Sequence, residues 1–427
     1  MDAYEVPDGG YGWIICLSAA IICFLSEAFV GIFSVSYLEL VHAFGANYTI
    51  ISWIGGVSSL LNTFMINILN KPLFKKFGYR PGGFLGPALL STGFFAASFT
   101  GSVWLLIGTF GIMPALGSTV STMSGSTAIN EWFEIRRPVA IAIPYIGSSI
   151  GTMSWPQLAG YTNSLYSWRG TMMIAAAIQL HGFLCIALLR RPPRQNQPNK
   201  NNYENLTNSD NNMDTAPHLQ ADLKTYILFF ALITCVYGGH YVTLAYLPTI
   251  ATMNGISKFQ SRLLISMVGL MGIVFRPLAG SIGIKIKENR VWLLASCLVT
   301  SSVLSAILCF LPTHALFIIY AVCFGIYSST YDVLAQSLCL DLWHRDHLVL
   351  TVSVLFSAAS FGSFLGFVLP GIAMDVFKNA SSAFAVCSFL HAAAFLFLLL
   401  ILRLRKKKKT VSYGATDQQP HVTNELQ

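Results

Sequence analysis

Twelve long apolar runs constrain the fold of this chain more than any other feature. Each run holds about 20 residues or more, which at a rise of about 1.5 Å per residue spans a hydrocarbon core of about 30 Å. The runs lie near 12–36, 48–70, 82–100, 103–127, 138–160, 168–189, 224–248, 262–284, 291–312, 314–340, 348–372 and 381–402. We predict an all-α, polytopic membrane protein with twelve transmembrane helices in two six-helix bundles. A binding site is expected between the bundles, near the membrane midplane.

The composition supports this class and excludes others. Only 10% of the residues are charged and 54% are hydrophobic, with a mean hydropathy of +0.60. No water-soluble domain of this length has so little charge. We assign the net charge of +8 to loop and tail bases that face anionic lipid, so a lipid bilayer is expected as partner and nucleic acid is not.

Enzymatic and metal sites are not expected. The nine cysteines form no CxxC or Cys/His ligand pattern, so we predict neither disulfides nor a metal site. The sequence holds no nucleophile–base–acid set and no phosphate-binding loop. We therefore predict that the chain is not an enzyme and has no cofactor.

The polar segments divide the chain. A stretch rich in Asn and Pro, without hydrophobic periodicity, separates the sixth run from the seventh and is predicted to be a disordered linker. The predicted segments are an N-terminal cytoplasmic tail (1–10), an N-terminal bundle (11–190), the cytoplasmic linker (191–223), a C-terminal bundle (224–403) and a basic cytoplasmic tail (404–427).

The basic residues predict the orientation. With both termini in the cytoplasm, most of the 26 Lys and Arg residues fall in cytoplasmic loops and tails, as the positive-inside rule requires. We expect a multi-pass protein of the plasma membrane. The sequons at Asn47 and Asn379 then lie outside, and the sequence leaves their glycosylation open.

Arg276 stands inside an apolar run, roughly 21 Å along a helix that starts at Arg262. A charge at that depth costs about 2.5–3.5 kcal/mol on insertion scales, so it normally faces a partner or a watery path. Asp332, in the tenth run, is expected at a similar depth, and we predict that the two side chains pair. Either the pair is a purely structural latch, or a carboxylate substrate or a proton exchanges on it.

Two further residues belong to the predicted site. Glu27 is the third intramembrane charge and could accept a cation or a proton; the alternative is a Glu bonded only to neighbouring hydroxyls. Ser328 precedes Asp332 by one helical turn and is expected to line the same cavity. A lone membrane histidine is more often a packed hydrogen-bonding group than a proton relay, and His240 is the histidine to test.

Several motifs resemble those of the monocarboxylate transporter family, a branch of the major facilitator superfamily. The opening, Pro7-Asp8-Gly9-Gly10-Tyr11-Gly12-Trp13, is similar to the first-helix signature of that family. The segment Trp132-Phe133-Glu134-Ile135-Arg136-Arg137-Pro138, with Gly147 and Ser148, resembles the signature that enters helix five. Further similarities are Phe77-Gly78-Tyr79-Arg80, Trp168-Arg169-Gly170 and Phe275-Arg276-Pro277.

The resemblance implies the major facilitator fold, alternating access and roles for these motifs. Asp8, Arg80, Arg137 and Arg169 become candidate gating or motif residues; the bases beside Gly78 could instead bind lipid phosphates. Proton-linked lactate carriers of the family have a lysine where Gly31 stands and an Asp where Gly272 stands, so Gly31 is included in the candidate substrate site. Some members need a single-span accessory glycoprotein, and the sequence leaves such a partner open.

The sequence thus predicts a secondary transporter of small monocarboxylates or related organic solutes. Arg276 is expected to bind the carboxylate, and Asp332 and Glu27 are the candidates for proton coupling. One alternative is a proton-independent facilitator of zwitterionic or aromatic solutes, since the chain lacks the lysine and gains two acids. An alternative from another class is a membrane receptor or scaffold that transports nothing.

Overall fold

The computed structural model describes residues 7–64, 74, 76–192, 216–285, 290–342 and 348–416. Throughout these ranges the regular structure is helical, which confirms the predicted all-α class. Nine helices or helix pairs in this part of the chain are long and apolar enough to cross a membrane. The count of twelve spans stays a prediction.

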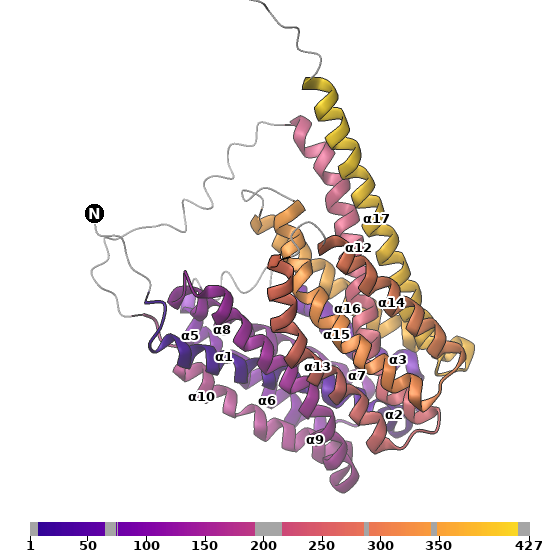
Figure 1. Ribbon diagram of the computed structural model, residues 1–427. Helices are drawn as coiled ribbons and strands as arrows, with labels where there is room; N and C mark the ends of the chain where they lie inside the picture. The colour runs from indigo at the N-terminus through magenta and orange to yellow at the C-terminus, as the bar shows by residue number, and fades with distance from the viewer. Residues whose placement is uncertain are drawn as a thin grey trace, which may run out of the picture.

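The N-terminal half begins with α1 and ends with α10 (Figure 1). Its elements are α1 (Gly12–Ser26), α2 (Ala28–Phe44), α3 (Tyr48–Phe64), α5 (Tyr79–Gly83), α6 (Leu85–Ser98), α7 (Val103–Leu106), the π-helical turn η2 (Ile107–Ile112), α8 (Met113–Trp132), α9 (Arg137–Gln179) and α10 (His181–Leu188). The fifth and sixth apolar runs both fall on α9 and α10. The backbone of α9 leaves the helical region at Ser167, with φ 60° and ψ 176°, so the chain turns there between the two runs.

The C-terminal half contains six long helices, one for each of the last six apolar runs. They are α12 (Ala216–Met253), α13 (Lys258–Lys285), α14 (Arg290–Phe310), α15 (His314–Leu342), α16 (Leu348–Phe377) and α17 (Ser382–Thr416). Helix α12 begins at Ala216, inside the segment 191–223 that composition assigns to the linker, and the domain bounds stay predictions. Apolar residues at 216, 219, 223 and 227 follow a helical spacing, which explains the earlier start.

Large apolar side chains cover much of the surface of the helices. Leu184, Phe389 and Leu396, for example, are 66%, 72% and 59% exposed. Water would disfavour apolar surface on this scale, whereas lipid tails accommodate it. The protein is therefore a multi-pass membrane protein.

The helix expected over 12–36 is interrupted at Glu27, between α1 and α2. Side chains from α9 bind the carbonyls of the last turn of α1. Trp155 Nε1 donates to the Phe24 carbonyl at 2.8 Å, and Gln179 Nε2 donates to the Leu25 carbonyl at 2.9 Å. These donors compete with the backbone N–H groups of the next turn, and this competition accounts for the break beside an acidic side chain.

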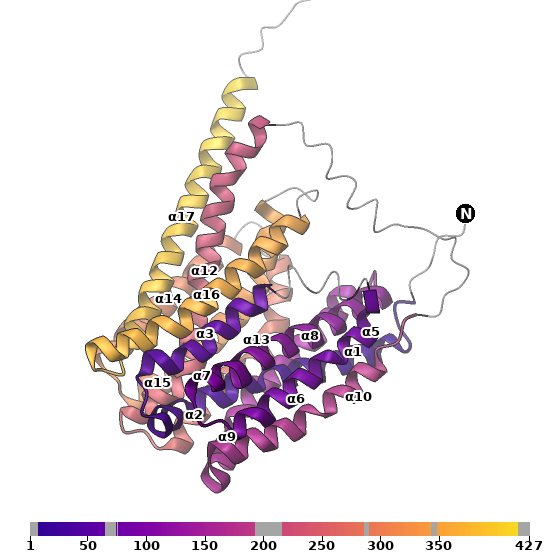
Figure 2. The same cartoon turned by 180° about the vertical axis from the view of Figure 1, so that it is seen from behind.

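The two halves lean together at one end and separate toward the other, as both views show (Figures 1 and 2). Among the described residues, the most extensive contacts between the halves are those of α2 with α12, α3 with α16, and α9 with α13. The contact between α9 and α13 is close because Gly269 has no side chain. A Cβ there would lie 2.6 Å from the backbone nitrogen of Met153.

Polar contacts hold the halves at the end where they meet, which we name the closed end (Tyr48, Thr49, Glu39, Lys258 and Asp375). Asp375 of α16 accepts hydrogen bonds from the backbone N–H groups of Tyr48 and Thr49, at 3.2 and 2.8 Å, and from the Thr49 hydroxyl at 2.6 Å. This carboxylate from one half caps the N-terminus of α3 in the other half, where the helix dipole favours negative charge.

Candidate functional site

Arg276 and Asp332 form an ion pair between α13 and α15. The Arg276 Nη2 atom lies 3.0 Å from Asp332 Oδ2, and both side chains are more than 80% buried. The predicted pairing is confirmed. Within so little water the two charges attract more strongly than at a surface, and neither is left uncompensated.

Arg276 also reaches across to the other half of the molecule. Its Nη1 atom donates to the Tyr145 carbonyl at 2.7 Å and to the Ser149 hydroxyl at 2.6 Å, both on α9. Its guanidinium lies 5.8 Å from the centre of the Tyr145 ring. Arg276 thus links Asp332 of the C-terminal half to α9 of the N-terminal half.

Glu27 lies on the opposite side of the same segment of α9. The hydroxyl of Ser148 donates to Glu27 Oε1, and the next residue, Ser149, bonds Arg276. Glu27 packs against Gly151, where a Cβ would lie 2.8 Å from the Cβ of the glutamate. We name Glu27, Arg276 and Asp332 the charged cluster. The sequence analysis named Ser148 only as part of a family motif and missed Ser149 and Tyr145; the neighbouring Ser148–Ser149 hydroxyls in an apolar run were the only signal.

Two predicted site residues are placed differently from the expectation. Gly31 is buried against α9, and a Cβ there would lie 2.5 Å from the Cβ of Trp155, so no side chain fits toward the site. Ser328 is buried and donates to the Gly325 carbonyl of its own helix. Its neighbour Ser329 points toward α13 instead. A Cβ at Gly272 of α13 would lie 3.7 Å from Ser329 Oγ and 2.9 Å from Ser149 Oγ.

Aromatic residues of α12 and α15 surround the acid. The Tyr237 hydroxyl donates to Asp332 Oδ1 at 3.4 Å. The Tyr237 ring contacts Tyr331 at a centroid distance of 5.4 Å and His240 at 6.3 Å. Each oxygen of Asp332 therefore has a different partner, the cation on one side and a phenol on the other.

The charged cluster holds two acids and one base. With both acids ionised, the cluster has a net negative charge that a proton or a positively charged group of a solute can neutralise. A carboxylate can bind the guanidinium in the place of Asp332, because the fork of an arginine suits any carboxylate. The arrangement can therefore exchange counter-ions.

Asp8 is placed at the start of α9, far along the chain from its own position. Its carboxylate accepts hydrogen bonds from the backbone N–H groups of Glu134, Ile135 and Arg136, at 2.8, 3.1 and 3.1 Å. Desolvation tends to raise the pKa of Asp8. The three backbone donors and the charge of Arg136 outweigh that effect, so the pKa lies below its ordinary value. The first family motif thus stabilises the second by capping the helix that carries Tyr145, Ser148 and Ser149.

The other motif residues are cations at helix ends. Arg137 donates from Nε to the Phe133 carbonyl at 3.0 Å and so closes the same loop. Arg169 donates to the Ser98 carbonyl at 2.8 Å and lies 4.5 Å from the centre of the Trp168 ring, which ties α9 to the end of α6. Arg80 is exposed on α5. Their gating roles stay predictions.

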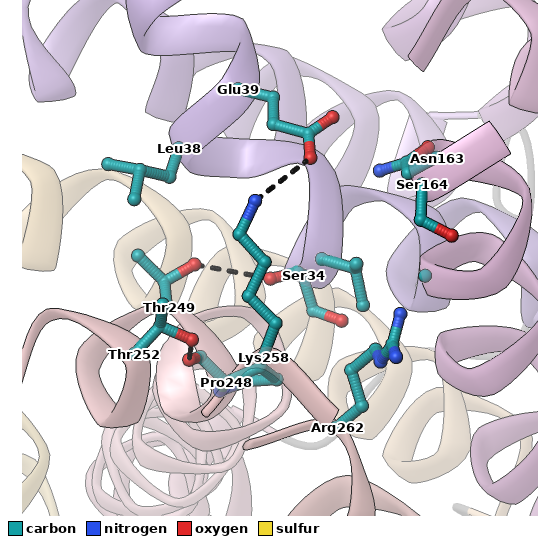
Figure 3. Close-up of a pocket in the computed structure, with 12 residues that line it drawn as sticks. Ser34, Leu38, Glu39, Asn163, Ser164, Pro248, Thr249, Thr252, Lys258 and Arg262 are labelled. Atoms are coloured by element: carbon teal, nitrogen blue, oxygen red, sulfur yellow. Dashed lines mark hydrogen bonds and ion pairs between the residues drawn. The ribbon is translucent and has the colours of Figure 1, made fainter. Parts of the chain in front are cut away.

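A separate pocket of about 140 Å³ lies at the closed end (Figure 3). Side chains of both halves line it, and Lys258 Nζ lies 3.9 Å from Glu39 Oε1 across the interface. Arg262 packs over Gly160 of the other half, where a Cβ would lie 1.8 Å from its Nη1. None of the residues of the charged cluster lines this pocket. The pocket is therefore part of the interface between the halves at the closed end, and not of the charged cluster.

The family model of the Major Facilitator Superfamily matches residues 18–295 and 228–424. The chain belongs to the major facilitator superfamily. The predicted fold class is confirmed, and the protein is a secondary transporter. Its relatives are transporters as well, in agreement with the expectation that the chain is not an enzyme.

Curated relatives confirm the resemblance to monocarboxylate transporters. Monocarboxylate transporter 2 of Mesocricetus auratus is 26% identical over 354 residues, which cover 79% of this chain and 72% of that protein. Monocarboxylate transporter 6 of Mus musculus is 27% identical over 406 residues, covering 90% and 86%. Monocarboxylate transporter 13 of Rattus norvegicus is 24% identical over 396 residues, covering 92% and 88%.

Solved structures share the fold at low sequence identity. A POT family transporter in complex with 5-aminolevulinic acid has a TM-score of 0.71 and 13% identity, covering 94% of this chain and 98% of that one. A D-xylose-proton symporter has a TM-score of 0.68 and 15% identity, covering 91% and 97%. These likenesses establish the fold and not the solute.

Proposed function

We propose that this transporter moves small monocarboxylates by alternating access, with Arg276 as the carboxylate-binding residue. The observation that carries the proposal is the bridging position of Arg276, which bonds Asp332 in its own half and Tyr145 and Ser149 in the other. A solute held on this guanidinium lies between the halves, where the two-bundle design places its substrate. The names of the relatives support a monocarboxylate as the solute.

Asp332 acts in this proposal as the resident counter-ion. An arriving carboxylate replaces Asp332 on Arg276, and Asp332 returns when the solute leaves. The Tyr237 hydroxyl, 3.4 Å from the other oxygen of Asp332, stabilises the displaced carboxylate. Tyr145 and Ser149 hold the guanidinium in place during the exchange, because they bond a different nitrogen from the one that faces Asp332.

The conformation follows from the predicted orientation. The closed end carries the sequons at Asn47 and Asn379 beside Tyr48 and α17, so we assign it to the outside. The halves separate at the other end (Figure 2), which we assign to the cytoplasm. The orientation predicted from the basic residues assigns both termini to the same side. The structure is then the inward-facing state of a plasma-membrane protein.

One observation favours a second candidate. The charged cluster has two acids for one base, and Gly31 leaves no room for the lysine found in proton-linked lactate carriers. A zwitterion such as a neutral amino acid would place its carboxylate on Arg276 and its ammonium group between Asp332 and Glu27. Such a solute would move without a proton.

The test is uptake of labelled pyruvate, lactate and neutral amino acids by cells that express the full chain. Arg276→Gln is expected to reduce uptake by about 10- to 100-fold, since a hydrogen bond to a charged group contributes about 1.5–3 kcal/mol. Arg276→Lys keeps the charge but not the fork, so it is expected to restore only part of the uptake.

The matched control is Lys258→Gln, which removes a cation that is 77% exposed at the closed end. Uptake that survives Arg276→Gln would refute Arg276 as the carboxylate-binding residue. Absence of uptake for every solute, with normal surface delivery, would favour the receptor or scaffold alternative. Surface delivery is compared with and without a single-span glycoprotein partner, because the family resemblance leaves that requirement open.

A further inference from the structure

His240 lies beside the charged cluster, one helical turn after Tyr237 on α12. Its ring is half-buried and stacks on Phe324 at a centroid distance of 5.6 Å. It contacts Tyr331 edge-on at 5.6 Å and Tyr241 at 5.5 Å. Packing on these three rings and on Tyr237 fixes the position of the imidazole, and none of them supplies a hydrogen-bond partner to its Nδ1 atom.

The Nδ1 atom of His240 is buried and has no hydrogen-bond partner in the described part of the chain. The same holds for the hydroxyls of Tyr331 and Tyr327 and for Nε2 of His391. These residues are contiguous, with Tyr331 on Tyr327 at 5.3 Å and Tyr327 on His391 at 5.3 Å. An unpaired buried polar atom costs about 1–3 kcal/mol, so four adjacent ones indicate that a ligand with protons to share, such as water, belongs there.

This group is connected to Asp332. Tyr237 contacts the His240 ring and donates its hydroxyl to Asp332 Oδ1. Tyr331, whose ring lies 5.6 Å from the His240 ring, directly precedes Asp332 on α15. The titratable groups that contact His240 are Tyr237 and Tyr241 on α12 and Tyr331 on α15. The titratable and charged groups that contact these residues or follow them in a chain of contacts are Tyr327 and Asp332 on α15, Arg276 on α13, and Cys387 and His391 on α17.

The affinity of the His240 imidazole for a proton depends on whether Asp332 or a solute carboxylate is paired with Arg276. While Asp332 is paired with Arg276, the two opposite charges largely cancel at the imidazole. When a carboxylate occupies Arg276, that cation is neutralised by the solute and Asp332 loses its partner. The field at His240 then becomes negative, and an imidazolium becomes the replacement counter-ion of Asp332.

We infer that His240 is the proton-binding residue of a symport cycle, taking up one proton when a carboxylate displaces Asp332 from Arg276. The proton comes from water on the loading side, binds an imidazole nitrogen and leaves as the carboxylate leaves on the other side. One anion and one proton cross together, so no net charge moves. Binding of each favours binding of the other, as linkage requires. The inference rests on the proposed function.

The experiment uses the purified full chain in liposomes loaded with a pH-sensitive dye. Labelled pyruvate is the probe, and two rates are measured: net uptake with internal acidification, and pyruvate–pyruvate exchange, which needs no net proton movement. For His240→Gln, the ratio of net uptake to exchange is expected to fall by at least about tenfold, within the range of ordinary coupling free energies. The control His181→Gln, at an exposed histidine of α10 that is not part of the charged cluster, is expected to leave the ratio unchanged.

Each outcome decides something. No pyruvate uptake by the unaltered protein overturns the proposed monocarboxylate function, and the inference with it. Uptake without acidification overturns the inference and leaves the transporter a facilitator. Coupled uptake by both the unaltered protein and His240→Gln assigns the proton to Asp332 or Glu27 and also overturns it. If His240→Gln does not fold, His240→Asn carries the test, because its amide likewise cannot take up the proton; an unchanged ratio there overturns the inference.

Discussion

The ion pair between Arg276 and Asp332 should show strong energetic coupling in a double-mutant cycle. Both side chains are more than 80% buried, and Nη2 lies 3.0 Å from Oδ2. Removing one partner of a buried pair costs about 3–5 kcal/mol because the other charge is left behind. Arg276 retains Tyr145 and Ser149, and Asp332 retains Tyr237, so we expect the lower end of that range.

The perturbations are Asp332→Asn, Arg276→Gln and the double variant. Each single substitution is expected to lower the free energy of unfolding by about 3 kcal/mol. The double variant leaves no charge behind, so its loss should fall short of the sum by about 2 kcal/mol, within the usual range for residues in contact. The free energies are measured by chemical unfolding of the purified full chain in mild detergent.

The pair Glu39→Gln and Lys258→Gln is the control cycle. Its charges are 3.9 Å apart, and the side chain of Lys258 is 77% exposed, so solvent screening should keep the coupling below about 1 kcal/mol. Losses at Arg276 and Asp332 that add to within about 0.5 kcal/mol would refute the reasoning. The ion pair would then contribute no more than an exposed one.

Three further predictions concern helix contacts and caps. Gly269→Ala places a Cβ 2.6 Å from the Met153 backbone, so it should push α9 and α13 apart and lower the melting temperature measurably. The control Gly101→Ala, where nothing lies within 4 Å of the new Cβ, should leave the melting temperature unchanged. Equal melting temperatures for the two variants would contradict the close approach. Gly31→Lys should destabilise the protein by about 1–3 kcal/mol through overpacking against Trp155, without raising carboxylate uptake; increased uptake by a stable variant would contradict the geometry. Because the folded-state pKa of Asp8 is lowered, its carboxylate stabilises the protein above its unfolded pKa of about 3.9 and loses that effect as the pH falls through the folded value. The melting temperature of Asp8→Ala should therefore lie below that of the unaltered protein at pH 7 and converge with it below about pH 4; a difference that persists in acid would exclude this cap.

The sequence predicted the parts of the fold and site that depend on rare residue types. Long apolar runs permit few structures in a bilayer, so the helices were predictable from hydropathy alone. Arg276 and Asp332 were predictable as a pair, because an isolated charge at that depth is costly and the chain offers few partners. Both inferences rest on large free energies that no local detail can reverse.

The remaining features depend on common residue types and on packing. Nothing in the sequence marks the Tyr145 carbonyl or the Ser149 hydroxyl as ligands of Arg276, since serines occur throughout the apolar runs. The break at Glu27 is caused by Trp155 and Gln179, more than 120 residues away in the chain. Gly31 was placed in the site by analogy with a lysine, but only the packing of α2 on α9 shows that no space remains for a side chain.

The position of the acid distinguishes this chain from the proton-linked lactate carriers that it resembles. The family resemblance implies that in those carriers the acid precedes the arginine by one turn on the same helix, where this chain has Gly272. A Cβ at Gly272 would lie 2.9 Å from Ser149 Oγ, so the space next to α13 is taken by a hydroxyl from the opposite half. The acid instead comes from α15, as Asp332. Arg276 can then bond both halves at once, one nitrogen on each side. An acid on α13 would share one helix with the arginine, whereas Asp332 belongs to a different helix, α15, and also accepts a hydrogen bond from Tyr237 of α12.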